Sequence, residues 1–470
     1  MKCFVAVLGV ALAFTLGPVP VLAQTNSELN AGIQFDFSLP GARSLSLGGA
    51  FVALADDATA VWGNPAGLTI LTRPEISAEG RFWNFNNVVT DKGHAFGNAT
   101  NVGFDNITGL EDAESDSWTQ SLAFLSYVHP MGRWTFGAYR HQVSNFSADI
   151  QSSGPFLDSG GDVDRVEPFR GTMDLDIVNY GVSAGVRVGQ NLSLGAGATF
   201  EQFSIESHTA RSIYIPVLPP PPALRPLYTN TGQRFGPPDY SEGNVFMDVA
   251  ESGTDWSTGF NVGALWRANR WSAGAAYRFG PTFHYDATTT IGPGGAKEPF
   301  LAPYVGTVFD TERVAFNLPD TIALGFTVKP LETLVVTFEY DRVEYSQLSE
   351  STAEVFGIEE NISAATGQLI RESLKFPDAN QFRFGAEYAI ARPSGAVLLR
   401  FGGWIDPDHR MQYVDPQNRA PRLAVLFRPG EDEFHVAPGV GFAFQKFQID
   451  AALDVSQRVN TVSVSTVFRF

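Results

Sequence analysis

The sequence predicts an all-β transmembrane fold: a 14-stranded antiparallel outer-membrane β-barrel with a small N-terminal helical hatch inside the lumen. Three observations predict it. From about Arg73 onward, apolar side chains alternate with small or polar ones at period two, as in strands with two different faces. These segments run to about 10–18 residues, whereas strands of soluble proteins average about 5–6. The connections alternate between short and long, as an outer-membrane barrel requires.

The first element is a predicted signal peptide. Lys2 precedes an apolar run over residues 4–16, and Ala23 closes a small-residue cleavage pattern. We expect residues 1–23 to be removed, and with them Cys3, the single cysteine. The apolar run is too short to span a bilayer as a helix.

The second element, residues 24–72, has helical rather than strand character. Its middle, residues 48–68, is rich in alanine and opens with Gly48-Gly49. The dipeptide Asn64-Pro65 then ends any helix, because the residue before a proline is pushed out of the α region. A barrel of fourteen strands is too wide for side chains alone to fill. Residues 24–72 are therefore predicted to plug the lumen as a hatch.

The barrel itself is predicted to occupy residues 73–470. The fourteen expected strands lie near 73–85, 117–129, 132–146, 171–188, 191–207, 254–267, 270–286, 311–328, 333–348, 379–391, 395–405, 433–445, 446–455 and 458–470. Short turns between them belong on the periplasmic side and long loops outside.

The apolar face of these strands has two possible partners, a soluble core or lipid. In the last strand Val462, Val464 and Phe468 share one face, and Ser463 and Ser465 lie on the other. Aromatic residues at strand ends favour lipid, because they match the interfacial girdles of a barrel. These residues are Trp134, Trp266, Trp271, Tyr388 and Phe470.

Composition excludes several function classes. A net charge of −18 removes the electrostatic signature of a nucleic-acid binder. One cysteine is too few for a disulfide framework or a cysteine-rich zinc site. No phosphate-binding loop or metal-spaced histidine cluster is present, so we expect no cofactor and no metal.

At several motifs the chain resembles the FadL/TodX-type outer-membrane transporters of long-chain fatty acids and other hydrophobic compounds. The motifs are GARSLSLGGAFVALADDATAVWGNPAGL at 41–68, LPDTIALGFTVKP at 318–330, FEYDRVEYSQL at 338–348, FRFGAEY at 382–388 and LLRFGGWIDPDH at 398–409. The resemblance implies a hatch-plugged barrel whose substrates enter from outside, meet the hatch and leave sideways into the bilayer. The lateral exit of that family lies at a kink in the third strand, where this sequence offers only Gly137. PorV-like barrels of secretion systems have a similar opening motif.

The candidate site residues form three groups. The hatch or gate residues are Trp62, Gly63, Asn64, Pro65, Ala66 and Gly67, for which simple packing at a helix end is the alternative. Asp56 and Asp57 are expected to bond to lumen arginines or to backbone. The charged residues expected to face the lumen are Glu201, Arg278, Glu339, Asp341, Arg383, Glu387, Arg400, Asp450 and Asp454. Mixed charge is common in a wet barrel lumen, so we expect no catalytic residue and no enzyme activity.

The sequence thus predicts a bacterial outer-membrane protein for passive transport of hydrophobic small molecules, either long-chain fatty acids or aromatic hydrocarbons. Its expected partners are outer-membrane lipid and lipopolysaccharide, the hydrophobic ligand and the barrel assembly machinery, with the protein itself a monomer. The alternative is a PorV-like structural barrel that anchors or shuttles partner proteins. An apolar, ligand-sized cavity between hatch and outer loops would distinguish the two.

Overall fold

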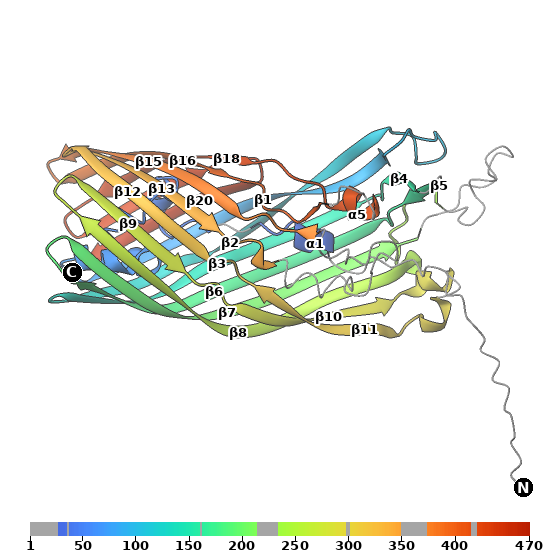
Figure 1. Cartoon of the computed structure of the whole chain (residues 1–470), viewed down its shortest axis with the longest axis horizontal. Coiled ribbons are helices and arrows are strands. Elements are labelled where there is room, and N and C mark those ends of the chain that lie inside the picture. Colours follow the sequence, from blue (N-terminus) through green and yellow to red (C-terminus); the bar gives the residue numbers. More distant parts are fainter. Residues whose placement is uncertain are drawn as a thin grey trace, which may run out of the picture.

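The computed structural model describes residues 27–34, 37–159, 162–213, 234–297, 301–348, 374–414 and 421–470. The expected signal peptide lies outside these ranges. The chain forms a long barrel with the C-terminus at the end of the short turns and the longer loops at the opposite end (Figure 1). We call these the short-turn end and the long-loop end.

The barrel wall is a closed antiparallel sheet, and the predicted fold class is confirmed. Within the described residues the wall has 14 strands, two of which are interrupted. They are β1 (Glu75–Ala95), β2 (Gly109–Met131), β3 (Trp134–Ser152), β6 (Phe169–Arg187), β7 (Leu192–Ser212), β8 (Val245–Arg267), β9 (Trp271–Arg278) with β10 (Thr282–Ile291), β11 (Val308–Asn317) with β12 (Thr321–Leu331), β13 (Leu334–Val343), β15 (Ala379–Arg392), β16 (Gly395–Asp406), β18 (Glu433–Ala443), β19 (Phe447–Asp454) and β20 (Val459–Arg469). Pairing of β1 with β20, from Glu75 with Arg469 to Phe85 with Val459, closes the barrel.

Both interruptions fall at prolines. Pro281 separates β9 from β10, and Pro319 separates β11 from β12. Proline lacks the backbone N–H that a ladder needs, so a central strand breaks there. Asp320 bridges the two breaks by accepting hydrogen bonds from the Gly280 N–H and the Tyr277 hydroxyl.

Short elements lie inside the barrel and at its long-loop end. Those at the N-terminus are α1 (Ser27–Ala31), α2 (Ala42–Leu45), α3 (Ala60–Gly63) and the 3₁₀ helix η1 (Pro65–Ile70). Those at the long-loop end are β4 (Phe156–Ser159), β5 (Asp162–Arg165), η3 (Glu242–Asn244), η4 (Pro293–Lys297), η5 (Ala302–Tyr304), β14 (Leu374–Lys375), β17 (Gln412–Tyr413) and α5 (Pro421–Leu426). Among the described residues, no helix is long and apolar enough to cross a membrane.

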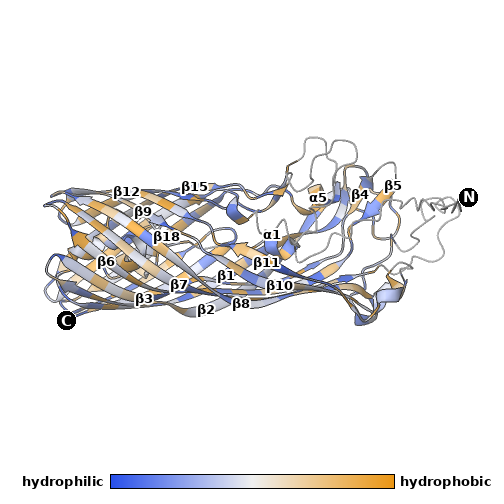
Figure 2. Cartoon of the chain, turned by 60° about the horizontal axis from the view of Figure 1, so that its bottom comes forward, coloured by the Kyte–Doolittle hydropathy of each residue, from blue (hydrophilic) through white to orange (hydrophobic). Residues whose placement is uncertain are grey.

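The outer surface of the wall carries an apolar belt. Leu453 and Val464 are 41% and 49% exposed, and hydrophobic positions alternate with hydrophilic ones along the strands (Figure 2). The stacked rings of Tyr180, Phe200 and Trp256 mark the upper edge of this belt. Beyond that edge the exposed side chains of β6 are polar, at Arg170, Thr172 and Asp174. The strands therefore continue past the membrane at the long-loop end.

Candidate functional site

Residues 37–71, which we call the inner segment, lie inside the barrel near the short-turn end. Helix α2 packs against β18, β19 and β20, and η1 packs against β3, β6, β7 and β8 on the other side. The side chains of Leu47, Phe51 and Leu68 are fully buried. The inner segment thus reaches from one side of the wall to the other.

Glycines of the wall let the inner segment approach the strand backbones closely. A Cβ at Gly195 would lie 2.3 Å from the backbone N of Ala66, and one at Gly274 would lie 2.3 Å from the carbonyl O of Val52. The wall glycines whose added Cβ would meet the inner segment within 3 Å are Gly137, Gly185, Gly195, Gly263, Gly274, Gly325, Gly385, Gly402 and Gly439. They come from nine strands around the wall, so the close fit extends around most of the circumference.

A buried ionic chain fastens the inner segment to the wall. Arg43 pairs with Asp56 at 2.5 Å and with Asp57 at 3.3 Å, both within the segment, and with Glu387 of β15 at 3.0 Å. Arg400 of β16 pairs with the same Glu387 at 2.7 Å and continues the chain to Asp450 of β19. Asp56 and Asp57 therefore reach the wall through Arg43 of their own segment rather than through a lumen arginine.

Other charged residues of the predicted set also contact the inner segment. Glu339 accepts a hydrogen bond from the Val52 N–H at 2.7 Å. Arg383 pairs with Asp341 at 2.6 Å and donates to the Gly48 carbonyl, and Arg278 donates to the Gly63 carbonyl.

Two predicted residues bond only within the wall in the contacts that the structure describes. Glu201 accepts from Asn179 and Thr199, and Asp454 contacts His435. All nine predicted lumen charges are buried inside the barrel.

Sequence reasoning missed a further anchor on β1. Glu79 accepts from the Gly41 N–H at 2.7 Å and pairs with Arg81. Arg81 in turn donates to the Ser38 hydroxyl and to the Leu39 carbonyl. Both residues share the inward face of a predicted strand, so the period-two pattern contained the signal.

The predicted gate residues form the turn between α3 and η1. The Asn64 side chain is fully buried, donates to the carbonyls of Val52 and Ala264, and accepts from the Ala66 N–H. The last of these bonds caps η1, and Pro65 takes its first position, where no N–H is needed. The ring of Trp62 lies 6.0 Å from that of Tyr139 and 5.5 Å from that of His141, both on β3.

The wall is incomplete between β2 and β3. Their backbone ladder runs from Met131 paired with Trp134 up to Phe124 paired with His141, and it ends there. We call the unpaired stretch, residues 109–123 of β2 and 142–152 of β3, the β2/β3 seam. The register of β3 against β6 also shifts between Gln142 and Ser144, as at a β-bulge.

Side chains bridge this seam in place of backbone bonds. Thr119 donates to the Asn145 carbonyl at 2.8 Å, Ser115 to the Asp149 carbonyl at 2.5 Å, and Arg140 to the Leu122 carbonyl. The sequence pointed to Gly137 as the weak point of the third strand, and that interpretation was wrong. Gly137 pairs with Val128 inside the intact ladder and faces Val61 of the inner segment.

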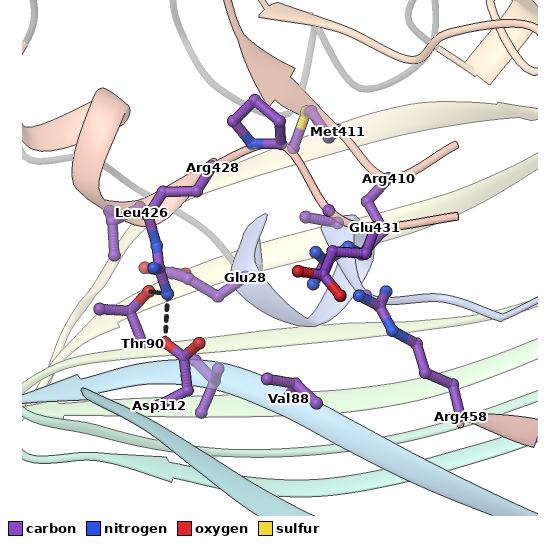
Figure 3. A pocket seen from close by; sticks show the side chains of 15 residues that line it. Glu28, Val88, Thr90, Asp112, Arg410, Met411, Leu426, Arg428, Glu431 and Arg458 are labelled. Carbon is purple, nitrogen blue, oxygen red and sulfur yellow. Dashed lines mark hydrogen bonds and ion pairs between the residues drawn. The ribbon is translucent and has the colours of Figure 1, made fainter. Parts of the chain in front are cut away.

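The lumen above the inner segment is apolar, and we call it the outer chamber. Its wall residues include Trp83, Phe85, Phe146, Ile150, Met173, Leu175, Ile177, Phe203, Phe283, Phe316 and Tyr345. Leu29 and Ile33, from residues 27–34 (the α1 region), pack into it. A buried ion pair of Glu28 with Arg211, at 2.6 Å, holds the α1 region in place. A cavity of about 250 Å³ adjoins the chamber between the α1 region and the long-loop end (Figure 3).

Histidines of the described chain do not form a hydrolytic site. His94 contacts Asp105 through Nδ1 at 2.9 Å, but its Nε2 contacts a second carboxylate, Asp158, rather than a hydroxyl. His435 contacts Asp454 and stacks on Trp404. Within the described ranges, no three His, Cys, Asp or Glu side chains are grouped to hold a metal ion.

This architecture defines an outer-membrane β-barrel with an apolar chamber over a close-fitting interior segment. The family model for outer membrane protein transport proteins (OMPP1/FadL/TodX) matches residues 23–466, and the chain belongs to that family. It is an outer-membrane protein of a family that transports hydrophobic compounds.

Individual relatives are distant in sequence. The long-chain fatty acid transport protein of Escherichia coli O6:H1 is 22% identical over 425 residues, which cover 86% of this chain and 81% of that protein. Among solved structures, a Pseudomonas aeruginosa FadL homologue is similar with a TM-score of 0.57 and 14% identity. The Ralstonia pickettii toluene transporter TbuX is similar with a TM-score of 0.55 and 17% identity. Each alignment covers 93% of this chain and 99% of the other, and at these identities it shows the shared fold.

Proposed function

We propose that this protein passively transports hydrophobic small molecules, long-chain fatty acids or aromatic hydrocarbons, with residues 24–72 acting as the plug. The observation that carries the proposal is the order of three features along the lumen. The apolar outer chamber lies toward the long loops, the closely fitted inner segment lies below it, and the β2/β3 seam opens the wall beside them. An apolar solute leaving the chamber therefore has the bilayer, and not water, as its next environment.

The route we propose enters at the long-loop end and leaves through the β2/β3 seam. Lipopolysaccharide opposes direct entry of apolar solutes from outside, so a protein path that ends in the bilayer core has a purpose that a watery pore lacks. Transfer from the chamber to lipid keeps apolar surface out of water throughout, which avoids a cost of about 25 cal/mol per Å². The side-chain bridges of the seam are weaker to open than a continuous backbone ladder.

The gate we propose is the turn at Trp62, Gly63, Asn64, Pro65, Ala66 and Gly67. Trp62 touches Tyr139 and His141 just where the β2–β3 ladder ends, so a shift of this turn would be felt at the seam. Gly63 supplies backbone freedom on one side of the turn. The three hydrogen bonds of Asn64 stabilise the closed arrangement.

A disulfide lock tests the gate. A Cβ at Gly137 would lie 2.9 Å from Cγ2 of Val61, within the range that a disulfide between these positions needs. Cells carrying Val61→Cys with Gly137→Cys should take up a labelled hydrophobic solute slowly when oxidised and recover when reduced. The single variants under the same oxidation are the controls. Normal uptake by the locked protein would reject the gate.

A structural barrel that anchors or shuttles partner proteins is the alternative, and the arrangement does not favour it. Such a barrel would not need an apolar chamber above its interior segment. The relatives named above are transporters, and we propose the same class for this chain. We further propose that it assembles through the barrel assembly machinery and works as a monomer.

A further inference from the structure

The cavity of about 250 Å³ at the long-loop end combines positive charge with an apolar border (Figure 3). Its lining includes three arginines, Arg410, Arg428 and Arg458, which come from the loop after β16 and from the turn before β20. Met411 and Leu426, also in the lining, belong to or pack against the apolar cluster of the outer chamber. The cavity is therefore polar on one side and continuous with the chamber on the other.

The arginines are held by one edge of their guanidinium groups. Arg410 contacts Asp408 through Nε at 3.3 Å, and Arg458 contacts Glu433 through Nε at 3.4 Å. Contacts at Nε leave the terminal amino groups of both side chains to face the cavity. Paired terminal N–H groups are the part of arginine that binds a carboxylate in bidentate fashion.

The carboxylates around the cavity are largely committed elsewhere. Glu28 pairs with Arg211 and Asp112 pairs with Arg428. The exception is Glu431 in the loop before β18, which is exposed; Figure 3 shows Glu431, Arg410 and Arg458 reaching toward one another. Burial and the neighbouring guanidinium of Arg458 lower the pKa of Arg410. Two partly buried cations that face one cavity create a position where an anion is stabilised.

A second, narrow cavity extends from the same two arginines into the chamber. It shares Arg410, Arg458 and Glu28 with the first cavity and continues to Phe146, Ala148 and Ile150 on β3. Those three side chains lie on the chamber face of β3, just beyond its register shift. A molecule with a negative group at the arginines would thus place an apolar chain toward the β2/β3 seam.

From this geometry we propose that Arg410 and Arg458 form a binding site for the carboxylate of a long-chain amphiphile, with Glu431 occupying the anion position when no ligand is bound. The inference rests on the proposed function and narrows it to anionic amphiphiles over neutral hydrocarbons. The apolar chain lies along the chamber face of β3, and Leu29 of the α1 region must shift to admit it.

The test compares oleate with oleyl alcohol, which has the same chain without the charge. Binding of each labelled compound is measured to purified full-length protein in a non-ionic detergent. The double variant Arg410→Gln with Arg458→Gln should weaken oleate binding by about tenfold to a hundredfold, the worth of one to two charged hydrogen bonds, and leave oleyl alcohol binding unchanged. Glu431→Gln should strengthen oleate binding only, because it removes the competing carboxylate.

Arg422→Gln is the matched control, since Arg422 lies on the same loop outside the cavity lining and pairs with Glu167. Heat-modifiable migration in gels shows whether each variant forms the barrel. Equal losses for oleate and oleyl alcohol, or no loss for oleate, would overturn the carboxylate site while leaving transport of apolar compounds standing. A wild-type protein that binds neither compound would overturn the proposed function together with this inference.

Discussion

The two halves of the lumen differ in chemistry although the same strands build both. In the inner half, the wall presents glycines, hydroxyls and paired charges to residues 37–71. In the outer half, the same faces present aromatic and aliphatic side chains, and only the short α1 region lies among them. On β6, for example, Ser183 and Gly185 face the inner segment, whereas Met173 and Ile177 line the outer chamber.

The difference teaches how one barrel can be closed and still receive apolar molecules. Glycines and charges provide directional, close contacts, and such contacts specify one position for a segment. Apolar side chains provide non-directional burial, which accepts molecules of varied shape. We infer that the inner half determines whether the path is shut and the outer half determines what enters it.

Deleting the interior residues should separate the two halves with the largest effect. Removal of residues 24–72 should raise single-channel conductance in planar bilayers from almost none to that of an open pore, because a lumen this wide is not filled by its own side chains. Removal of residues 24–34 alone should leave the conductance low, since the inner segment and its ionic chain remain. Low conductance after the longer deletion would place the closure elsewhere.

The shorter deletion should also act on the outer half. Without Leu29 and Ile33 the outer chamber gains apolar surface for a ligand. Binding of a hydrophobic probe should become tighter than in the wild-type protein. Weaker binding would mean that the α1 region forms part of the ligand site instead of filling it.

The outside of the wall should show a matching division along its length. Leu453→Arg places a charge in the lipid-facing belt and should lower the free energy of unfolding by about 2–4 kcal/mol near the bilayer midplane. Thr172→Arg lies on an exposed face beyond the ring of Tyr180, Phe200 and Trp256, and should change it little. Denaturant unfolding from lipid vesicles measures both variants. Equal effects would place the membrane boundary incorrectly.

Much of this arrangement is local in sequence and was predictable. Alternation at period two identified all fourteen wall strands, because each strand has a lipid face and a lumen face along most of its length. The lumen positions of Glu339 and Arg383 followed from the same alternation. The helical composition of residues 48–68 indicated an interior element for the same reason, since it interrupts that pattern.

The remainder depends on relations that alternation does not contain. Met173, Leu175 and Ile177 continue the face of Asn179, so the switch from polar to apolar lumen involves no change of period. The seam arises where β2 and β3 stop pairing with each other while each keeps its other neighbour. The arginine cavity joins Arg410 to Arg458 across two strands.

The wall glycines should be sensitive to the smallest possible side chain. Gly195→Ala and Gly274→Ala put a Cβ 2.3 Å from backbone atoms of the inner segment, so the segment must move. We expect a loss of about 1–3 kcal/mol in the stability of the closed state, as for overpacked cores. More frequent opening events in planar bilayers would report it. In Gly80→Ala, the control, the nearest atom to the new Cβ is 4.0 Å away, and the closed state should persist.

The smallest expected effect concerns the β2/β3 seam. Thr119→Val keeps the shape of the side chain and removes its hydrogen bond to the Asn145 carbonyl. One such bond contributes about 0.5–1.5 kcal/mol, so the seam should open about two- to tenfold more often. Amide hydrogen exchange over residues 142–152 should accelerate by that factor. Thr288→Val is the control, because Thr288 lies where β10 and β11 pair continuously and its hydroxyl contacts only Thr311 in the described contacts. If exchange near Thr288 rose as much as exchange at the seam, the two walls would be equally firm, and the exit would have to lie elsewhere. A rise confined to the seam would place the weakest part of the wall beside the outer chamber, where a ligand released by the inner segment would meet it.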